Sequence, residues 1–192
     1  MNQPLDVLKA HWKHDAFRPT QEEIINTVLA GKDTFALLPT GGGKSICFQI
    51  PALIKPGICL VISPLVALMK DQVENLKNKN IKAIALTGGI SFEETNNLLD
   101  NCSFGGYKFL YVSPQRLQQD WVLERIKNLN VNLVAIDEAH CISQWGHDFR
   151  PAYLKIAALK EYFHVPFIAL TATATPRVQT DICTLLQLEN PI

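Results

Sequence analysis

Short runs of apolar, often β-branched residues alternate along the chain with longer stretches in which apolar residues recur at helical spacing. Most of the short runs are apolar throughout, without the alternation of a strand that has one face in water. Strands have this composition when helices cover both faces of a parallel sheet. The runs that predict strands are Thr34–Leu37, Ile58–Ile62, Lys82–Leu86, Phe109–Val112, Leu133–Ile136 and Phe167–Leu170.

The stretches between these runs contain signals for the start of helices. Thr20 with Glu23, and Ser91 with Glu94, have the spacing of a capping box. One stretch also predicts a single apolar stripe along a helix. Its members are Leu65, Leu68, Met69, Val73 and Leu76. The alternation of strands and helices predicts an α/β domain with a mainly parallel sheet and helices on both faces.

The carboxyl ends of the predicted strands meet at one edge of the sheet, because crossovers between parallel strands are right-handed. Ligands of such folds bind at that edge. Ser63-Pro64, Ser113-Pro114 and Thr175-Pro176 each follow a predicted strand. Ser or Thr is a favoured N-cap, and Pro is a favoured first helical residue. We expect three helices to begin at this edge, where their free backbone N–H groups could bind phosphates. For each of the three, the alternative is that the residues only cap a helix.

A glycine-rich loop lies between the first predicted strand and a helical stretch. Glycines allow the backbone to wrap closely around an anion. Lys44 would reach the β- and γ-phosphates of a nucleotide, and Ser45 would bind Mg²⁺. The general phosphate-loop pattern has glycine where this chain has Leu38. The predicted phosphate-binding residues are Thr40, Gly41, Gly42, Gly43, Lys44 and Ser45.

Two acidic residues follow the apolar run that ends at Ile136. Asp137 would hold the metal ion, since a carboxylate at the tip of a buried strand suits Mg²⁺ coordination. Glu138, directly beside it, can orient or deprotonate an attacking water. Together with Lys44, these residues are the predicted catalytic groups of a nucleotide hydrolase. A glutamate beside the metal ligand favours water as the acceptor over a small-molecule substrate.

Composition limits the possibilities without deciding among them. The chain has 192 residues, 47% hydrophobic and 19% charged, which is typical of one globular domain. Lys and Arg number 18, as do Asp and Glu, so the net charge is zero. A globally basic surface for nucleic acid is therefore excluded, and any such binding must come from a local site.

The cysteines and the apolar runs indicate the compartment. None of the five cysteines forms a CxxC pair, and most lie in apolar runs, so we expect buried free thiols in a reducing environment. The N-terminus has no signal-peptide pattern, and no apolar run is long enough to span a membrane. We expect a cytoplasmic or nucleoid-associated protein without a membrane partner.

Several segments resemble the motifs of RecQ DNA helicases, a family of superfamily 2. Asp137-Glu138-Ala139-His140 resembles the DEAH form of motif II, and the run from Cys141 to Tyr153 resembles the aromatic-rich RecQ loop. The remaining matches lie in the family's order along the chain. They are Phe17–Gln21 (motif 0), Leu38–Ser45 (motif I), Ile62–Leu65 (motif Ia), Tyr111–Leu117 (the next DNA-side motif) and Leu170–Ala174 (motif III).

The resemblance implies a role for each segment. Arg18 and Gln21 would contact the adenine of ATP, although His14 stands where the family often has an aromatic residue. Trp145 and Phe149, among polar neighbours, would stack on single-stranded bases from an exposed loop; a packed core pair is the alternative. The residues implied in DNA binding or coupling are Ser63, Pro64, Ser113, His140, Gln144, Trp145, Phe149, Arg150, Thr171 and Thr173.

The resemblance further implies that residues 1–192 form the first RecA-like motor domain of an ATP- and Mg²⁺-dependent 3′→5′ helicase, acting on single-stranded and forked DNA in recombination and repair. A second motor domain with an arginine finger, and zinc-binding and winged-helix domains, would lie outside this sequence. We therefore expect the segment alone to bind Mg-ATP weakly, hydrolyse it slowly and not unwind DNA. The alternatives are a DEAH-type RNA helicase, a translocase that does not unwind, and an ATP-gated clamp without turnover.

Overall fold

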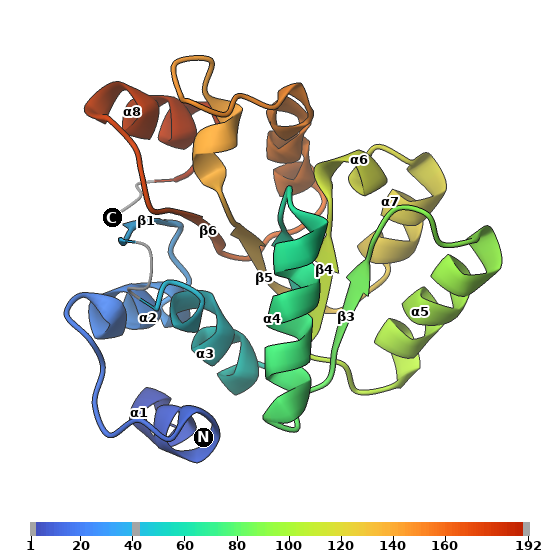
Figure 1. Cartoon of the computed structure of the whole chain (residues 1–192), viewed down its shortest axis with the longest axis horizontal. Helices are drawn as coiled ribbons and strands as arrows, with labels where there is room; N and C mark the ends of the chain where they lie inside the picture. Colours follow the sequence, from blue (N-terminus) through green and yellow to red (C-terminus); the bar gives the residue numbers. More distant parts are fainter. Residues whose placement is uncertain (1–2, 40–42, 190–192) are drawn as a thin grey trace.

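A parallel sheet forms the centre of the molecule, as a computed structural model that describes residues 3–39 and 43–189 shows (Figure 1). Within these residues the sheet has six strands in the order β1-β6-β5-β2-β4-β3, and every neighbouring pair is parallel. The predicted α/β architecture is confirmed. The strands are β1 (Thr34–Leu37), β2 (Ile58–Ile62), β3 (Ala83–Leu86), β4 (Phe109–Val112), β5 (Val131–Ile136) and β6 (Phe167–Thr171).

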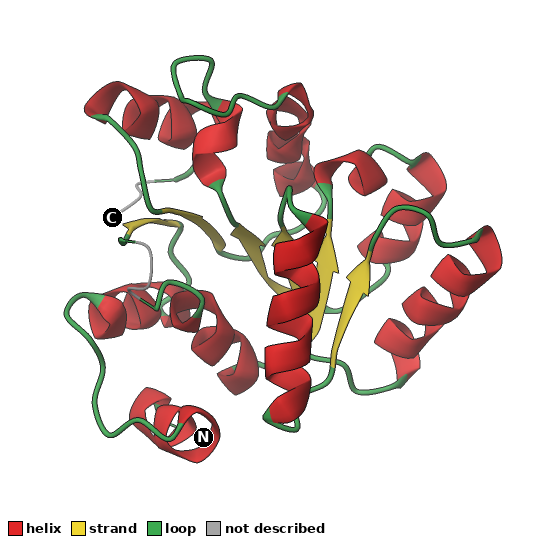
Figure 2. Ribbon diagram, in the orientation of Figure 1, coloured by secondary structure: helices red, strands yellow, loops and turns green. Residues whose placement is uncertain are grey.

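Helices cover both faces of the sheet (Figure 2). One face packs against α2 (Gln21–Leu29), α3 (Ile46–Ile54) and α4 (Val66–Asn78). The helical segments on the other face are α5 (Phe92–Phe104), α6 (Pro114–Leu117), α7 (Asp120–Lys127), η2 (Ala139–Ile142), η3 (Pro151–Glu161) and α8 (Pro176–Leu185). An N-terminal pair packs on α2 and α3 instead of the sheet; it consists of α1 (Pro4–Val7) and η1 (Leu8–Trp12).

The central strands explain why the sequence shows no alternation. In β2, Cys59 and Val61 pack toward α3 and α4, whereas Leu60 and Ile62 pack toward the opposite helices. All five residues of β2 are buried. Because both faces of such a strand are covered, both sets of side chains are apolar.

The predicted helix starts are only partly correct. Ser91, Ser113 and Thr175 accept hydrogen bonds from the backbone N–H three residues later and cap α5, α6 and α8. Thr20, in contrast, has a φ of 72° and makes no side-chain cap; its hydroxyl donates to the carbonyl of Pro19. Ser63 does not cap α4, which begins at Val66. Its hydroxyl is buried and has no partner among the residues that the structure describes.

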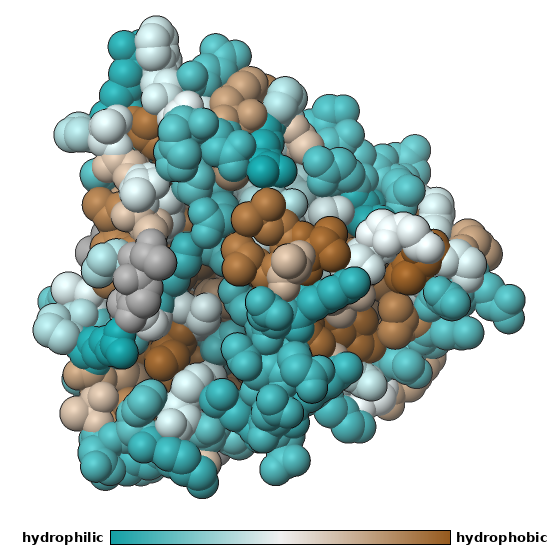
Figure 3. Space-filling model, viewed as in Figure 1, coloured by the Kyte–Doolittle hydropathy of each residue, from teal (hydrophilic) through white to brown (hydrophobic). Residues whose placement is uncertain are grey.

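The apolar stripe predicted for α4 divides into a buried and an exposed part. Met69, Val73 and Leu76 lie in the core, but Leu65 and Leu68 are 40% and 38% exposed. These two lie with the exposed Val66 on an apolar patch over the start of α4 (Figure 3). The stripe prediction is wrong at this end because Leu65 precedes α4 in an extended conformation and therefore does not continue the helical spacing.

Asp33 lies immediately before β1, at the end of the sheet where the strands begin. Its carboxylate is buried and accepts hydrogen bonds from the backbone N–H groups of Phe167 at 2.9 Å and Glu189 at 2.8 Å. It also forms an ion pair with Lys160 of η3. One buried charge thus joins β1, η3, the start of β6 and the C-terminal segment.

Candidate nucleotide and DNA site

Three adjacent strands, β1, β6 and β5, bring the predicted catalytic groups together at their carboxyl ends. Lys44 follows β1, and its Nζ lies 3.2 Å from Oδ1 of Asp137 and 3.0 Å from Oε1 of Glu138, both of which follow β5. These residues are more than ninety positions apart in the sequence. Burial lowers the pKa of Lys44, but the two carboxylates outweigh it and the net pKa is raised, so the amine stays charged.

The backbone holds the two carboxylates in different ways. Asp137 is 2% exposed; its Oδ1 accepts a hydrogen bond from the N–H of Glu138, and its carbonyl accepts one from the hydroxyl of Tyr153. Glu138 has a φ of 51°, a left-handed conformation that is uncommon outside glycine. This turn directs the chain into η2 while Glu138 remains partly exposed. Strain of this kind often marks functional sites.

A cavity of about 570 Å³ joins the motif 0 segment to the loop after β1. Gln21 is 2% exposed on its wall, donates from Nε2 to the carbonyl of Gly43 at 3.0 Å and accepts from the N–H of Arg18. Its amide therefore ties the two segments together. The cavity is lined by Leu8, His14, Asp15, Ala16, Arg18, Gln21, Gly43, Lys44, Ser45 and Ile46. Thr40, Gly41 and Gly42 lie outside the described residues.

Oxygen donors suited to a hard cation are present beside this cavity. Ser45 immediately precedes α3, and Asp137 offers a buried carboxylate at the end of β5. Mg²⁺ prefers such oxygen ligands, usually one or two carboxylates completed by water and phosphate. The residues therefore fit a Mg²⁺ ion bound with a nucleotide.

His140 connects the DEAH segment with the end of β6. Its Nδ1 lies 2.7 Å from the hydroxyl of Thr171, which also bonds the backbone of Thr173. The other ring nitrogen lies 3.7 Å from Oε2 of Glu138. Burial lowers the pKa of His140, against the opposing effect of Glu138, and therefore favours the neutral imidazole.

The loop from Ser143 to Arg150 leaves one of its two predicted aromatic residues at the surface. Trp145 is 61% exposed, whereas the side chain of Phe149 is half-buried. The two aromatic residues therefore do not form an exposed pair. Gln144 is exposed. Arg150 pairs with Asp148 at 3.2 Å within the loop.

Sequence reasoning missed two residues of α8 that hold this loop. The guanidinium of Arg177 lies 3.6 Å from the ring centroid of Trp145, and Asp181 accepts a hydrogen bond of 2.7 Å from Ser143. The only sequence signal is their spacing of four, which places Arg177 and Asp181 on one face of a helix. Nothing in the sequence indicates which loop that face meets.

Comparisons with known proteins show the family of the chain. The family model for DEAD/DEAH box helicases matches residues 18–182. The chain belongs to the DEAD/DEAH box helicase family. The match spans motif 0, the DEAH segment and motif III, and the resemblance to RecQ helicases is confirmed by relatives of that name.

Three relatives show how much of a RecQ-type helicase this family member spans. The chain is 48% identical to a probable ATP-dependent DNA helicase RecS of Bacillus subtilis, covering 92% of this chain and 36% of the relative. It is 47% identical to the ATP-dependent DNA helicase RecQ of Pasteurella multocida, covering 97% of this chain and 30% of the relative. It is also 47% identical to the ATP-dependent DNA helicase RecQ of Bacillus subtilis, covering 95% of this chain and 32% of the relative. The chain thus spans about a third of the length of these relatives.

Solved helicase structures share the fold. The Hef helicase domain of Pyrococcus furiosus is 26% identical with a TM-score of 0.69, covering 91% of this chain and 37% of that one. A hypothetical ATP-dependent RNA helicase of Sulfolobus tokodaii superposes with a TM-score of 0.74 at 20% identity, covering 100% of this chain and 56% of that one. At this identity the likeness shows the fold alone.

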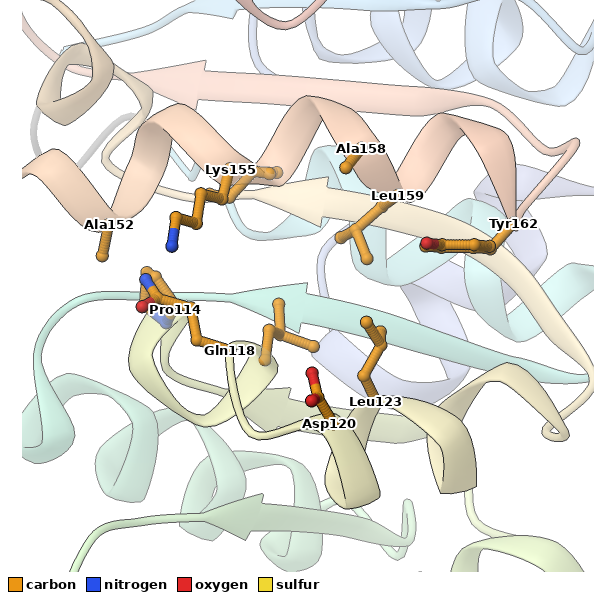
Figure 4. A pocket seen from close by; sticks show the side chains of 11 residues that line it. Pro114, Gln118, Asp120, Leu123, Ala152, Lys155, Ala158, Leu159 and Tyr162 are labelled. Carbon is orange, nitrogen blue, oxygen red and sulfur yellow. The ribbon is translucent and has the colours of Figure 1, made fainter.

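An apolar cavity of about 230 Å³ lies between α6, α7 and η3; its lining includes Pro114 and Leu117 of the Tyr111–Leu117 segment but no residue of the nucleotide cavity (Figure 4). The five cysteines are free thiols; four are buried, as expected, whereas Cys183 is half-buried. No helix in the described part of the chain is long and apolar enough to cross a membrane.

Proposed function

We propose that residues 1–192 form an ATP-binding motor domain of a RecQ-type DNA helicase. The observation that carries the proposal is the contact of Lys44 with Asp137 and Glu138 beside a cavity that Gln21 closes. A cation from one loop and two carboxylates from another are groups that phosphoryl transfer to water uses for positioning and charge neutralisation. The names of the relatives, all ATP-dependent DNA helicases, support ATP and DNA as the ligands.

We infer that nucleotide binding changes the partners of Lys44. In the structure, Asp137 and Glu138 neutralise the charge of Lys44. A triphosphate entering past Gly43 would draw the amine toward its β- and γ-phosphates and free both carboxylates. Asp137 and Ser45 would then hold Mg²⁺, which would neutralise charge on the phosphates. Glu138 would orient the attacking water and accept its proton.

The adenine would lie in the cavity at the other end of the site. Arg18 is exposed on the cavity wall, and the amide of Gln21 would exchange its bonds to Gly43 and Arg18 for the edge of the purine. His14 lines the same cavity and provides a ring where the family often has another aromatic residue.

DNA would bind along the same edge of the sheet. Ser113, at the N-terminus of α6, and Trp145, in the exposed loop, follow strands β4 and β5. His140 and Thr171 would link that surface to Glu138. We propose single-stranded and forked DNA as the substrates and 3′→5′ movement, driven together with a second motor domain.

The test is a titration of the chain with a fluorescent ATP analogue and Mg²⁺. We expect saturable binding by the wild type and its loss in Lys44→Ala. Lys32→Ala is the matched control, because Lys32 is exposed just before β1 at the opposite edge of the sheet. Glu138→Gln should bind the analogue but hydrolyse ATP more slowly. Equal binding by wild type and Lys44→Ala would refute the assignment of the phosphate site.

A further inference from the structure

Trp145 is held by a cation on one side and remains open to solvent. The residue is 61% exposed although the guanidinium of Arg177 lies 3.6 Å from the ring centroid. We propose that Arg177 and Asp181 of α8 are positioning residues that hold Trp145 as a platform on which a base of single-stranded DNA stacks. The inference rests on the proposed function, because it specifies how the DNA side of that site is kept in place.

Helix α8 holds the backbone of the platform as well as its ring. Ser143 is fully buried; its hydroxyl accepts a hydrogen bond from the N–H of Trp145 at 3.1 Å and donates one to Asp181 at 2.7 Å. Hydrogen bonds to charged groups are stronger than neutral ones. Arg177 and Asp181 are four residues apart on one face of α8, so a single helix fixes both parts of Trp145.

The helix that holds the platform is itself fixed to the sheet. Thr175 caps α8 at its start, and Val178 and Ile182 are 2% and 0% exposed in the core. The segment before Thr175 leads back to Thr171, whose hydroxyl contacts His140. A base that stacks on Trp145 therefore meets a ring that is already ordered, and an ordered contact loses less side-chain freedom on binding.

Arg177 acts through Trp145 in this arrangement, not through a phosphate. A phosphate contact would contribute to the salt dependence of binding, with a slope of about −0.7 per contact for single strands. A cation that supports an aromatic ring contributes to affinity without changing that slope. The two roles can therefore be separated by measuring binding at several salt concentrations.

The experiment measures binding of a fluorescein-labelled oligothymidylate to this chain by anisotropy. Arg177→Gln should weaken binding about two- to fivefold, the value of a cation–π contact at an exposed site, with the salt slope unchanged. Ser143→Ala, which changes no charge, should weaken it in the same direction. Arg177→Lys should restore part of the affinity, and Lys32→Gln, with the same charge loss at the opposite edge, should leave it unchanged.

A double-mutant cycle makes the test specific. In a Trp145→Ala background, Arg177→Gln should have no further effect, because residues that act as one unit are not additive. Tighter binding by Arg177→Gln would overturn the inference, because it would mean that Arg177 covers the face of Trp145 on which the base stacks. A salt slope reduced by about 0.7 would overturn it in favour of a direct phosphate contact.

The same measurements separate this inference from the proposed function. If the wild type binds the oligonucleotide and Arg177→Gln binds it equally well, the positioning role of α8 is wrong and the DNA site stands. If the wild type binds no oligonucleotide at low salt, the DNA assignment fails, and the inference that depends on it fails as well. Nucleotide binding that Lys44→Ala abolishes would still support the ATP assignment.

Discussion

Gly43 joins the loop after β1 to the motif 0 segment, and its replacement by alanine should weaken that junction. Its φ is +74°, and a Cβ at this position would lie 2.4 Å from Nε2 of Gln21. Alanine in a left-handed conformation costs about 1–2 kcal/mol. The added methyl would also push the Gln21 amide off the Gly43 carbonyl, and an unsatisfied buried amide costs about 1–3 kcal/mol.

The two effects together predict that Gly43→Ala lowers the free energy of unfolding by about 2–5 kcal/mol. Gly31 provides the matched control, because its φ is +85° and a methyl group added there would meet no other part of the described chain within 4 Å. Gly31→Ala should therefore show the backbone cost alone, about 1–2 kcal/mol. Urea unfolding followed by circular dichroism measures both, with equal slopes required for a valid comparison.

The outcome also bears on the nucleotide site. Since Gly43 and Gln21 line the same cavity, Gly43→Ala should weaken binding of an ATP analogue while Gly31→Ala leaves it unchanged. If the two variants lose equal stability and bind the analogue equally well, the Gln21–Gly43 hydrogen bond contributes nothing, and the reasoning is refuted.

Three further predictions concern other buried groups. Asp33→Ala should lower the free energy of unfolding by about 3–5 kcal/mol, measured by urea unfolding, because it removes a buried ion-pair partner of Lys160. Burial lowers the pKa of His140 from its ordinary 6.5, so the unfolded chain takes up the proton more readily than the folded one. The free energy of unfolding should therefore fall as the pH drops through 6.5, and it should fall less in His140→Asn. Unfolding curves at several pH values measure both. Burial raises the pKa of Cys47, Cys102 and Cys141 to about 12. Cys183, which is only half-buried, should therefore react first with a thiol reagent in the native protein, and Cys183→Ser should abolish the fast phase.

The strands could be predicted because their composition follows directly from burial on both faces. Their ends could not, as β5 shows: the structure begins it at Val131, two residues before the predicted start. The polar Asn132 ended the apolar run, yet it is buried, and its amide donates to the carbonyls of Ala52 and Lys55. A polar residue satisfied by a distant helix cannot be told from a loop residue by local pattern.

The nucleotide side of the site was more predictable than the DNA side. Lys44, Asp137 and Glu138 were predicted from loops that follow strands, and the parallel sheet then brought them within hydrogen-bonding distance. The contact between Trp145 and Arg177 depends on how a loop rests on a helix from another part of the chain. No short-range pattern specifies that packing, so it emerges only from the three-dimensional structure.

The carboxylate of Asp33 gives the two edges of the sheet different mechanical properties. Where the strands begin, the carboxylate connects the start of β1 to η3, the start of β6 and Glu189. These segments can therefore separate only if the buried charge becomes exposed. At the carboxyl ends, β1 and β6 and their neighbour β5 lead into loops, and the loop after β5 carries the exposed Trp145. We therefore expect a ligand that binds at the carboxyl ends of the strands to displace the loops there, while the contacts of Asp33 keep the beginning of β1 in place.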